Sequence, residues 1–462
     1  MKNLLKHQEV ISALELFSAW TEAQMAYRGH PGMSVGVVHD QTLVWSRGFG
    51  YADVEKQSPA TAATIYRIAS ITKTFTSLAV MQLRDEGLLQ LDDPVRKHLP
   101  WFEIRNPHQD VPEVTIRHLL THTGGLPREA AFPYWSTHEF PTREEIQQTV
   151  PGQELPIPPA SDWKYSNLGL ALAGEIVEKV SGMPYDRYIT DKILRPLGME
   201  NTFVAPVPPD HPLFATGYGR RLPDLSRSRA VYADCKGITP AANMASNVED
   251  LAKYMMLHFR SGPRRGKQVL AGSSLREMHR VHWLNSDWSA GRGLGFYVWR
   301  AQDRTWVGHG GSLYGYRTEI QFCPDDKVGV IVLTNADDGL PLHYVNKAFE
   351  WIVPAVVKAA APRPQRVVAP ENLDQYTGRY RNTWGDAQVI VHNGELVIIY
   401  PSEEDPMLGM ATLKPVGEHT FRIETKERFG NNGELAVFEM DASGHVVRLK
   451  TGNNYIYPVE SW

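Results

Sequence analysis

The stretch RIASITKTFTSLAVMQLRDEGLL, residues 67–89, places Ser70 and Lys73 where an apolar helix is about to begin. Its apolar residues recur at helical spacing over residues 72–86, and Gly87 is a typical helix end. Because residues at i and i+3 share a helix face, the hydroxyl of Ser70 and the amine of Lys73 are expected side by side. One interpretation is an N-cap serine followed by a surface lysine. The more specific one is a nucleophile with its own base.

Composition narrows the class of protein. The chain has 462 residues, so two or three domains are expected. Its net charge of -4, from 48 basic and 52 acidic residues, gives no indication of nucleic acid or a membrane as a partner. The first twenty residues carry Glu9 and Glu15 within their apolar pattern, which predicts an amphipathic helix rather than a signal peptide. No stretch is long and apolar enough to span a bilayer, so a cytoplasmic protein is expected.

Strand patterns lie near both ends of the first 360 residues, and helical patterns lie mostly between them. Residues 31–53, PGMSVGVVHDQTLVWSRGFGYAD, read as two strands joined by a turn, and further strands follow Gly293. Residues 90–230 mix helices with proline-rich loops. We therefore predict an α/β domain over residues 1–360. Its mixed, mainly antiparallel sheet would be flanked by helices and would carry an inserted helical subdomain.

The composition changes after residue 360. APRPQRVVAP, residues 361–370, is typical of a linker. Beyond it, apolar and polar residues alternate, and Asn393-Gly394 is the strongest short hairpin signal in the chain. Residues 371–462 are therefore predicted to form a small all-β domain, with a barrel as the expected form.

Three other patterns contain residue types that can carry chemistry. Ser34 lies in a G-x-S-x-G sequence, but that motif needs a helix after it, and a second strand follows here. His118 and His122 are four residues apart, yet the H-E-x-x-H pattern is absent. Cys235 and Cys323 show no metal-type spacing, and a disulfide between them stays open. We expect no metal and no cofactor.

Two further stretches complete a set with the opening one. Tyr165-Ser166-Asn167 precedes an apolar helix, whose N-cap could be Asn167, and His309-Gly310-Gly311 lies on a predicted strand. Serine-x-x-lysine, Tyr-x-Asn and a basic residue with glycine, in this order, resemble the serine beta-lactamase-like and penicillin-binding-protein-like hydrolases. The Tyr-x-Asn form is similar to the class C beta-lactamase branch, which includes D-aminopeptidases and carboxylesterases. This resemblance covers roughly residues 29–354, and the C-terminal domain resembles the lipocalin-like domains appended to some of these enzymes.

The resemblance implies roles for the motif residues. Ser70 would be the acylated nucleophile, with Lys73 and Tyr165 sharing the proton transfers. Asn167 would position the substrate amide. The backbone N–H groups of Ser70 and Ser312 would form an oxyanion hole. A free lysine or tyrosine titrates near pH 10, so a base that works at pH 7 needs a shift of about three units.

His309 departs from the lysine that beta-lactamases carry at this place. Histidine is only partly charged near neutrality, so we expect turnover of carboxylate-bearing substrates to fall above pH 7. His309, Gly310, Gly311 and Ser312 are taken as substrate-binding residues. The leading prediction is an amidase or D-aminopeptidase acting on a small molecule or short peptide. A carboxylesterase is the alternative, and a beta-lactamase or a slowly turning-over penicillin-binding protein is a further one. Formation of a homo-oligomer stays open.

Overall fold

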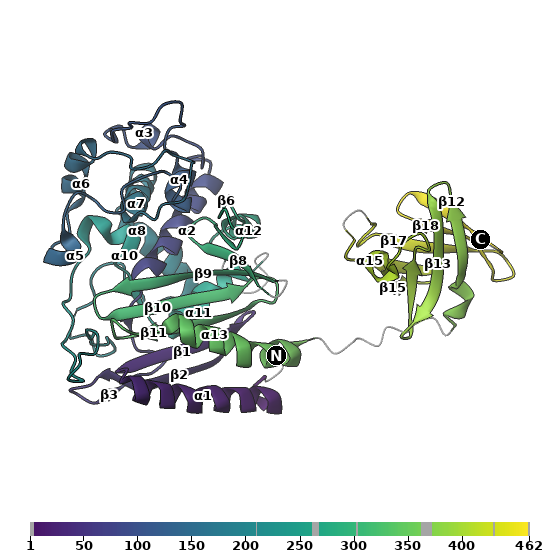
Figure 1. Ribbon diagram of the computed structural model, residues 1–462, viewed down its shortest axis with the longest axis horizontal. Helices are drawn as coiled ribbons and strands as arrows, with labels where there is room; N and C mark the ends of the chain where they lie inside the picture. The colour runs from purple at the N-terminus through teal and green to yellow at the C-terminus, as the bar shows by residue number, and fades with distance from the viewer. Residues whose placement is uncertain are drawn as a thin grey trace. The chain divides into compact units, whose positions relative to one another are not determined.

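The computed structural model describes residues 4–208, 210–260, 268–301, 304–361, 372–427 and 430–460. The chain divides into two compact units, residues 1–361 and residues 362–462 (Figure 1). The predicted linker at residues 361–370 lies almost wholly outside the described residues.

The larger unit is built on a nine-stranded sheet in which neighbouring strands are antiparallel. The sheet brings both ends of the unit together, because the N-terminal strand pairs with the last strand, Met33 lying opposite Thr334. The strands lie in the order β3 (Ser58–Pro59), β2 (Thr42–Asp53), β1 (Gly32–His39), β11 (Val328–Thr334), β10 (Tyr316–Cys323), β9 (Arg304–Leu313), β8 (Tyr297–Ala301), β7 (Ala290–Arg292) and β6 (Trp283–Leu284).

Helices cover both faces of this sheet (Figure 1). Strand β11 is buried at every position, since Val330 and Val332 belong to one core and Ile331 and Leu333 to the other. The first core is closed by helices α1 (Gln8–Arg28), α13 (Pro341–Trp351) and α14 (Val353–Ala360). The second is closed by helices that include α2 (Thr72–Asp85), α7 (Asn167–Ser181) and α11 (Val248–His258). Helices α13 and α14 meet at Ile352.

The predicted helical insertion lies between β2 and the second half of the sheet. Its α-helices besides α2, α7 and α11 are α3 (Val95–His98), α4 (Ile116–Thr121), α5 (Tyr134–Thr137), α6 (Arg143–Thr149), α8 (Tyr185–Ile189), α9 (Arg195–Leu197), α10 (Thr239–Ala242) and α12 (Gly272–Met278). Helix α2 runs through the middle and is buried from Thr72 to Leu83, as expected of a helix enclosed on all sides. Among the described residues, no helix combines the length and apolarity needed to cross a bilayer.

The smaller unit is a closed eight-stranded antiparallel barrel, which confirms the predicted C-terminal β domain. Its interior is filled by side chains that include Tyr376, Tyr380, Phe421 and Phe438. The predicted turn at Asn393-Gly394 has positive φ at both residues, as a two-residue hairpin turn requires. The strands are β12 (Gly378–Asn382), β13 (Gly385–His392), β14 (Glu395–Ile399), β15 (Ala411–Gly417), β16 (Thr420–Glu424), β17 (Leu435–Met440), β18 (Val446–Thr451) and β19 (Asn454–Val459).

The core around α2 yields a stability prediction. The Phe75 ring is fully buried and stacks on the Tyr254 ring at 3.9 Å between centroids. Phe75→Ala should lower the free energy of unfolding of the larger unit by about 3–5 kcal/mol, because it leaves a cavity in a packed core. Trp384→Ala, at a barrel residue that is 90% exposed, should change stability by no more than about 0.5 kcal/mol. Urea unfolding monitored by circular dichroism measures both, and equal losses would contradict this account of the core.

Candidate active site

Ser70 lies in a short 3₁₀ turn, η2 (Ala69–Ile71), that leads into α2. Ala69 adopts a positive φ of 48°, a conformation that costs a non-glycine residue energy and persists only where surrounding contacts hold it. Those contacts are present, since Thr72 Oγ1 donates to the Ala69 carbonyl at 2.6 Å and Thr318 Oγ1 on β10 donates to the Ile68 carbonyl at 3.1 Å. The backbone before α2 is therefore fixed with the Ser70 hydroxyl turned into the cleft.

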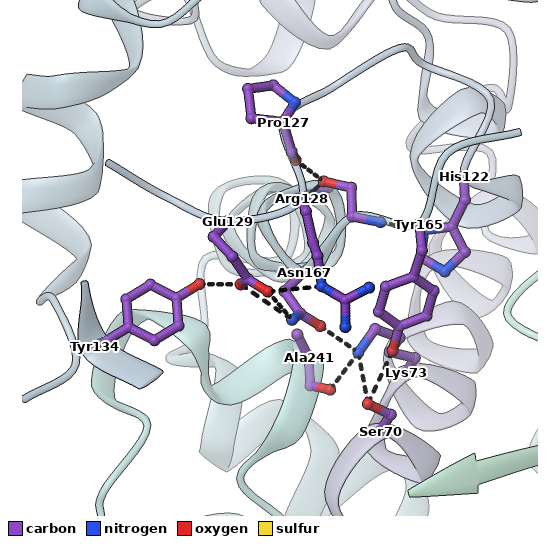
Figure 2. A network of polar contacts seen from close by, with 12 residues as sticks. Ser70, Lys73, His122, Pro127, Arg128, Glu129, Tyr134, Tyr165, Asn167 and Ala241 are labelled. Carbon is purple, nitrogen blue, oxygen red and sulfur yellow. Dashed lines mark hydrogen bonds and ion pairs between the residues drawn. The ribbon is translucent and has the colours of Figure 1, made fainter. Parts of the chain in front are cut away.

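Lys73 is completely buried one turn later, with its amine directed at Ser70 (Figure 2). Its Nζ lies 3.1 Å from Ser70 Oγ, 2.8 Å from Asn167 Oδ1 and 2.7 Å from the Ala241 carbonyl oxygen. Neither carbonyl oxygen can donate, so two N–H bonds of Lys73 are directed at them. The remaining direction on Lys73 Nζ faces Ser70. In the ammonium form a proton points at Ser70 Oγ, and in the neutral amine the lone pair does.

Burial lowers the pKa of Lys73 to about 7, against the opposing effect of the Glu129 carboxylate. A substantial fraction of Lys73 is therefore neutral near neutrality, with its lone pair towards the hydroxyl. The arrangement can remove a proton from Ser70.

Tyr165 approaches Ser70 from the other side and donates its hydroxyl proton to Oγ at 2.9 Å (Figure 2). Its ring lies 4.8 Å from Lys73 Nζ and 5.1 Å from the Arg128 guanidinium carbon, measured to the ring centroid. Burial nevertheless raises the pKa of Tyr165 above its ordinary value. The Arg128 charge lowers the pKa of Tyr165, but burial outweighs this effect. Tyr165 is therefore a phenol at neutral pH, and it can act as a proton donor.

Asn167 connects the lysine to an acidic group (Figure 2). Ser166, not Asn167, caps helix α7, since Ser166 Oγ accepts from the Gly169 N–H at 2.9 Å. This releases the Asn167 side chain into the site. There its oxygen accepts from Lys73, and its Nδ2 donates to both oxygens of Glu129 at 2.9 and 3.1 Å.

Glu129 is the principal residue that the sequence analysis did not single out. It also accepts hydrogen bonds from the Tyr134 hydroxyl and, at 3.2 Å, from Arg128 Nε. Since a carboxylate cannot donate, it fixes which end of the Asn167 amide faces the lysine. Only its position directly after the Gly-Gly-Leu-Pro-Arg run could have indicated a role.

His309, Gly310, Gly311 and Ser312 lie on β9 beside the serine. A Cβ on Gly311 would come within 2.2 Å of the Ile68 carbonyl oxygen, so glycine is required where this strand meets the turn that carries Ser70. The four residues and Ser70 line one cleft of about 1030 Å³.

The imidazole of His309 is uncharged at neutral pH. It is 4% exposed, and burial together with the Lys73 charge lowers its pKa to about 3. The expected loss of charge on His309 above pH 7 is therefore wrong, because burial has already removed that charge. Its ring lies 5.1 Å from the Tyr297 ring.

The less convincing sequence patterns have structural partners. Ser34 Oγ is buried inside β1, 2.6 Å from the Thr61 carbonyl oxygen. His118 Nδ1 accepts from the N–H of Thr115, the N-cap of helix α4, at 3.2 Å. His122 Nδ1 accepts from the Ser166 N–H at 3.2 Å, with its ring 4.5 Å from that of Tyr165. Both cysteines are free thiols.

A comparison with protein families identifies the class. The model of the family described as Beta-lactamase matches residues 17–353. The chain belongs to the beta-lactamase family. Its fold, an antiparallel sheet with flanking helices followed by a barrel, agrees with the predicted fold class and resemblance.

This chain is similar to curated proteins over most of its length. It is 30% identical over 333 residues to Protein flp of Staphylococcus aureus strain MW2, covering 71% of this chain and 64% of that protein. It is 29% identical over 456 residues to Beta-lactamase-like protein 2 of Dictyostelium discoideum, covering 91% of this chain and 82% of that protein. The chain thus spans slightly less than two thirds of the first relative's length.

Two solved structures are similar over most of their length. An octameric penicillin-binding protein homologue from Pyrococcus abyssi has a TM-score of 0.65 and 27% identity, covering 96% of this chain and 99% of that chain. A D-stereospecific amidohydrolase from Streptomyces has a TM-score of 0.61 and 25% identity, covering 72% of this chain and 97% of that chain. A hydrolase of the beta-lactamase fold is therefore supported, and the site residues keep the roles of predictions.

The titration of Lys73 predicts the pH dependence. If neutral Lys73 is the base, kcat/KM should rise with pH through about 7 and level off above it, because only the form deprotonated above its pKa accepts the proton. His309, neutral throughout this range, should add no second limb between pH 6 and 8. Lys73→Arg should lower kcat/KM by about 10²–10⁴, since arginine stays protonated. A flat profile in the wild type, or an active Lys73→Arg variant, would exclude Lys73 as the base.

The Glu129 carboxylate should influence the pH at which kcat/KM rises, which we call the acidic limb of the profile. Its charge favours the ammonium form of Lys73, so Glu129→Gln should lower the pKa of Lys73 and move the limb to lower pH. Glu139→Gln is the matched control, because Glu139 is an exposed residue of the same loop region. Its profile should coincide with that of the wild type. A limb that stays in place in Glu129→Gln would mean that the carboxylate only packs against Asn167.

Proposed function

We propose that this protein hydrolyses amide bonds of small molecules or short peptides, with a preference for D-configured acyl groups, through an acyl-enzyme on Ser70. The observation that carries the proposal is the position of Ser70 Oγ, 3.1 Å from the buried amine of Lys73 and 2.9 Å from the hydroxyl of Tyr165. Nucleophile, base and acid are thereby assembled without the histidine that most serine hydrolases use.

Acylation follows from the resting protonation states. Neutral Lys73 removes the proton of Ser70 as Oγ bonds to the substrate carbonyl carbon. The backbone N–H groups of Ser70 and Ser312 would stabilise the oxyanion. Tyr165, a phenol at rest, donates its proton to the leaving nitrogen as the C–N bond breaks. The acyl-enzyme is then left with Lys73 as ammonium and Tyr165 as phenolate.

Deacylation reverses these proton transfers and restores the site. The Tyr165 phenolate takes a proton from water as the water oxygen attacks the ester carbon. Lys73 then returns its proton to Ser70 Oγ as the C–Oγ bond breaks. The phenolate would exist only while Lys73 is charged 4.8 Å from its ring, so the two residues act as one coupled pair.

The resting state of Tyr165 supports an amide substrate over an ester. An amine leaves poorly as an anion and must be protonated, whereas an activated alcohol leaves without help. A phenol whose pKa is raised by burial keeps its proton available at every working pH. The likeness to a D-stereospecific amidohydrolase supports the same class and the D configuration. Formation of a homo-oligomer remains a prediction, supported only by the likeness to an octameric homologue.

One panel tests the proposal: D-alanine anilide, L-alanine anilide, a short-chain aryl ester and a chromogenic cephalosporin, each with wild type and Ser70→Ala. We expect the D-anilide to be cleaved faster than the L-isomer and the cephalosporin, and Ser70→Ala to lose at least about 10³-fold in kcat/KM. Turnover of the ester alone would replace the proposal with a carboxylesterase. Stoichiometric labelling without turnover would indicate a penicillin-binding protein, and activity in Ser70→Ala would remove the nucleophile.

A further inference from the structure

The cleft around Ser70 continues past β9 onto the opposite face of the sheet. Along β9, Val307 belongs to the core on the α2 side, whereas Trp306 packs on Phe349 of helix α13, with ring centroids 4.6 Å apart. Because side chains alternate along a strand, His309 faces α2 and Gly310 faces α13. Glu319 lies opposite Gly310 in the register of β9 with β10, so it also faces α13.

The single cleft that contains Ser70 and His309 is also lined from that second face. We call this part the reverse lobe. Its lining residues are Trp299, Glu319, Gln321, Pro341, Leu342 and Asn346.

Two features of β9 keep the passage to the reverse lobe open. The pairing of β8 with β9 ends where Tyr297 lies opposite Gly308, so within the described residues β8 covers only the first half of that edge. Beyond that point, glycine leaves space. A Cβ on Gly310 would lie 2.5 Å from Glu319 Oε2, so any side chain there would press against this carboxyl. Gly310 therefore leaves room for the Glu319 carboxyl in its present position, whereas at residue 311 a side chain would meet backbone.

Glu319 is the chemical feature of the reverse lobe. Its Oε1 accepts from Gln321 Nε2 at 3.0 Å, and among the described residues no cation forms an ion pair with it. Arg317 lies two residues away on the same face but is 3.3 Å from Asp337, which offsets its charge. Burial raises the pKa of the Glu319 carboxyl to about 7. Glu319 is half-buried in the wall of the cleft, and its Oε2 has no hydrogen-bond partner among the described residues, so this oxygen is open to a group on a bound molecule.

The reverse lobe lies towards the leaving group of a bound substrate. Tyr165, the proposed donor to that group, lines the cleft together with His309 and Tyr297, whose rings lie 5.1 Å apart beside the start of the passage. The acyl group would lie at the other end of the cleft, near Trp135 and Asn167. A leaving group longer than a few atoms would therefore extend over Gly310 towards Glu319.

We propose that the reverse lobe is a leaving-group subsite in which Glu319 selects leaving groups that end in an N–H donor, such as a carboxamide or an amine, over those that end in a carboxylate. This deepens the proposed amidase function and rests on it for the orientation of the substrate. An amide or ammonium N–H can bond to Glu319, whereas a carboxylate would meet a like charge or force the glutamic acid to hold its proton.

Binding to the inactive Ser70→Ala variant tests the proposal without requiring turnover. Calorimetric titration at pH 8 would compare D-alanyl-glycinamide with D-alanyl-glycine, which differ only at the end of the leaving group. We expect the carboxamide to bind at least about tenfold more tightly, and Ser70→Ala/Glu319→Gln to reduce this ratio below about threefold. Turnover of the same pair by the wild type, relative to Glu319→Gln, should show the same change in kcat/KM.

Gly310→Ala tests the passage itself, with Gly152→Ala as control because a Cβ at residue 152 meets no atom within 4 Å. In the Ser70→Ala background, Gly310→Ala should remove the binding advantage of D-alanyl-glycinamide over the shorter D-alanine methylamide, and Gly152→Ala should retain it. Equal affinities for carboxamide and carboxylate, a preference for the carboxylate through Arg317, or no binding of either would overturn the proposal. If the wild type did not turn over either compound but the binding preference for the carboxamide remained, only the amidase function would be overturned.

Discussion

The site depends on one buried amine that is held between two carbonyl oxygens. Lys73 has no exposed surface, and its charged form is costly there, so burial brings its pKa to about 7. Lowering a pKa is not sufficient for a base, because the lone pair must also point at the proton to be removed. The Asn167 side-chain oxygen and the Ala241 carbonyl oxygen provide this direction by taking two N–H bonds. Ser70 is the group left in the third position.

Much of the larger unit can be understood as support for that geometry. Helix α2 is enclosed between the sheet and the inserted helices, so its first turn cannot reach water and Lys73 is desolvated. The first and last strands of the unit pair with each other, which sets β9 and β10 at a fixed distance from the turn before α2. Gly311 and Thr318 then contact that turn directly at the Ile68 carbonyl. Residues far apart in sequence therefore determine the position of one hydroxyl.

The sequence predicted the elements and the principal residues of the site, because these depend on local patterns. The Ser70–Lys73 spacing, the strand patterns at both ends of the domain and the Asn393-Gly394 turn are all readable within a few residues. The predictions that were wrong concern properties that depend on burial by segments distant in sequence. Asn167 was a possible cap by residue type, yet Ser166 caps the helix because its hydroxyl reaches the Gly169 N–H. The charge on His309 was misjudged because desolvation cannot be read from neighbours in sequence. The contact of Glu129 with Asn167 could not be recognised for the same reason.

The charges in the cleft show why the catalytic motif does not by itself determine which substrates a member of this family binds. The motif supplies nucleophile, base and acid, but recognition of a substrate carboxylate needs a cation that is not already engaged. Here His309 is neutral, and the two arginines that line the cleft each lie beside a carboxylate, Arg128 at 3.2 Å from Glu129 and Arg317 at 3.3 Å from Asp337. Arg292 is buried and lies between the rings of Trp163 and Tyr297. A substrate carboxylate would have to compete with partners already in place, whereas a neutral amide would not. The electrostatics around the shared motif thus favour an uncharged substrate at the bond that Ser70 would attack.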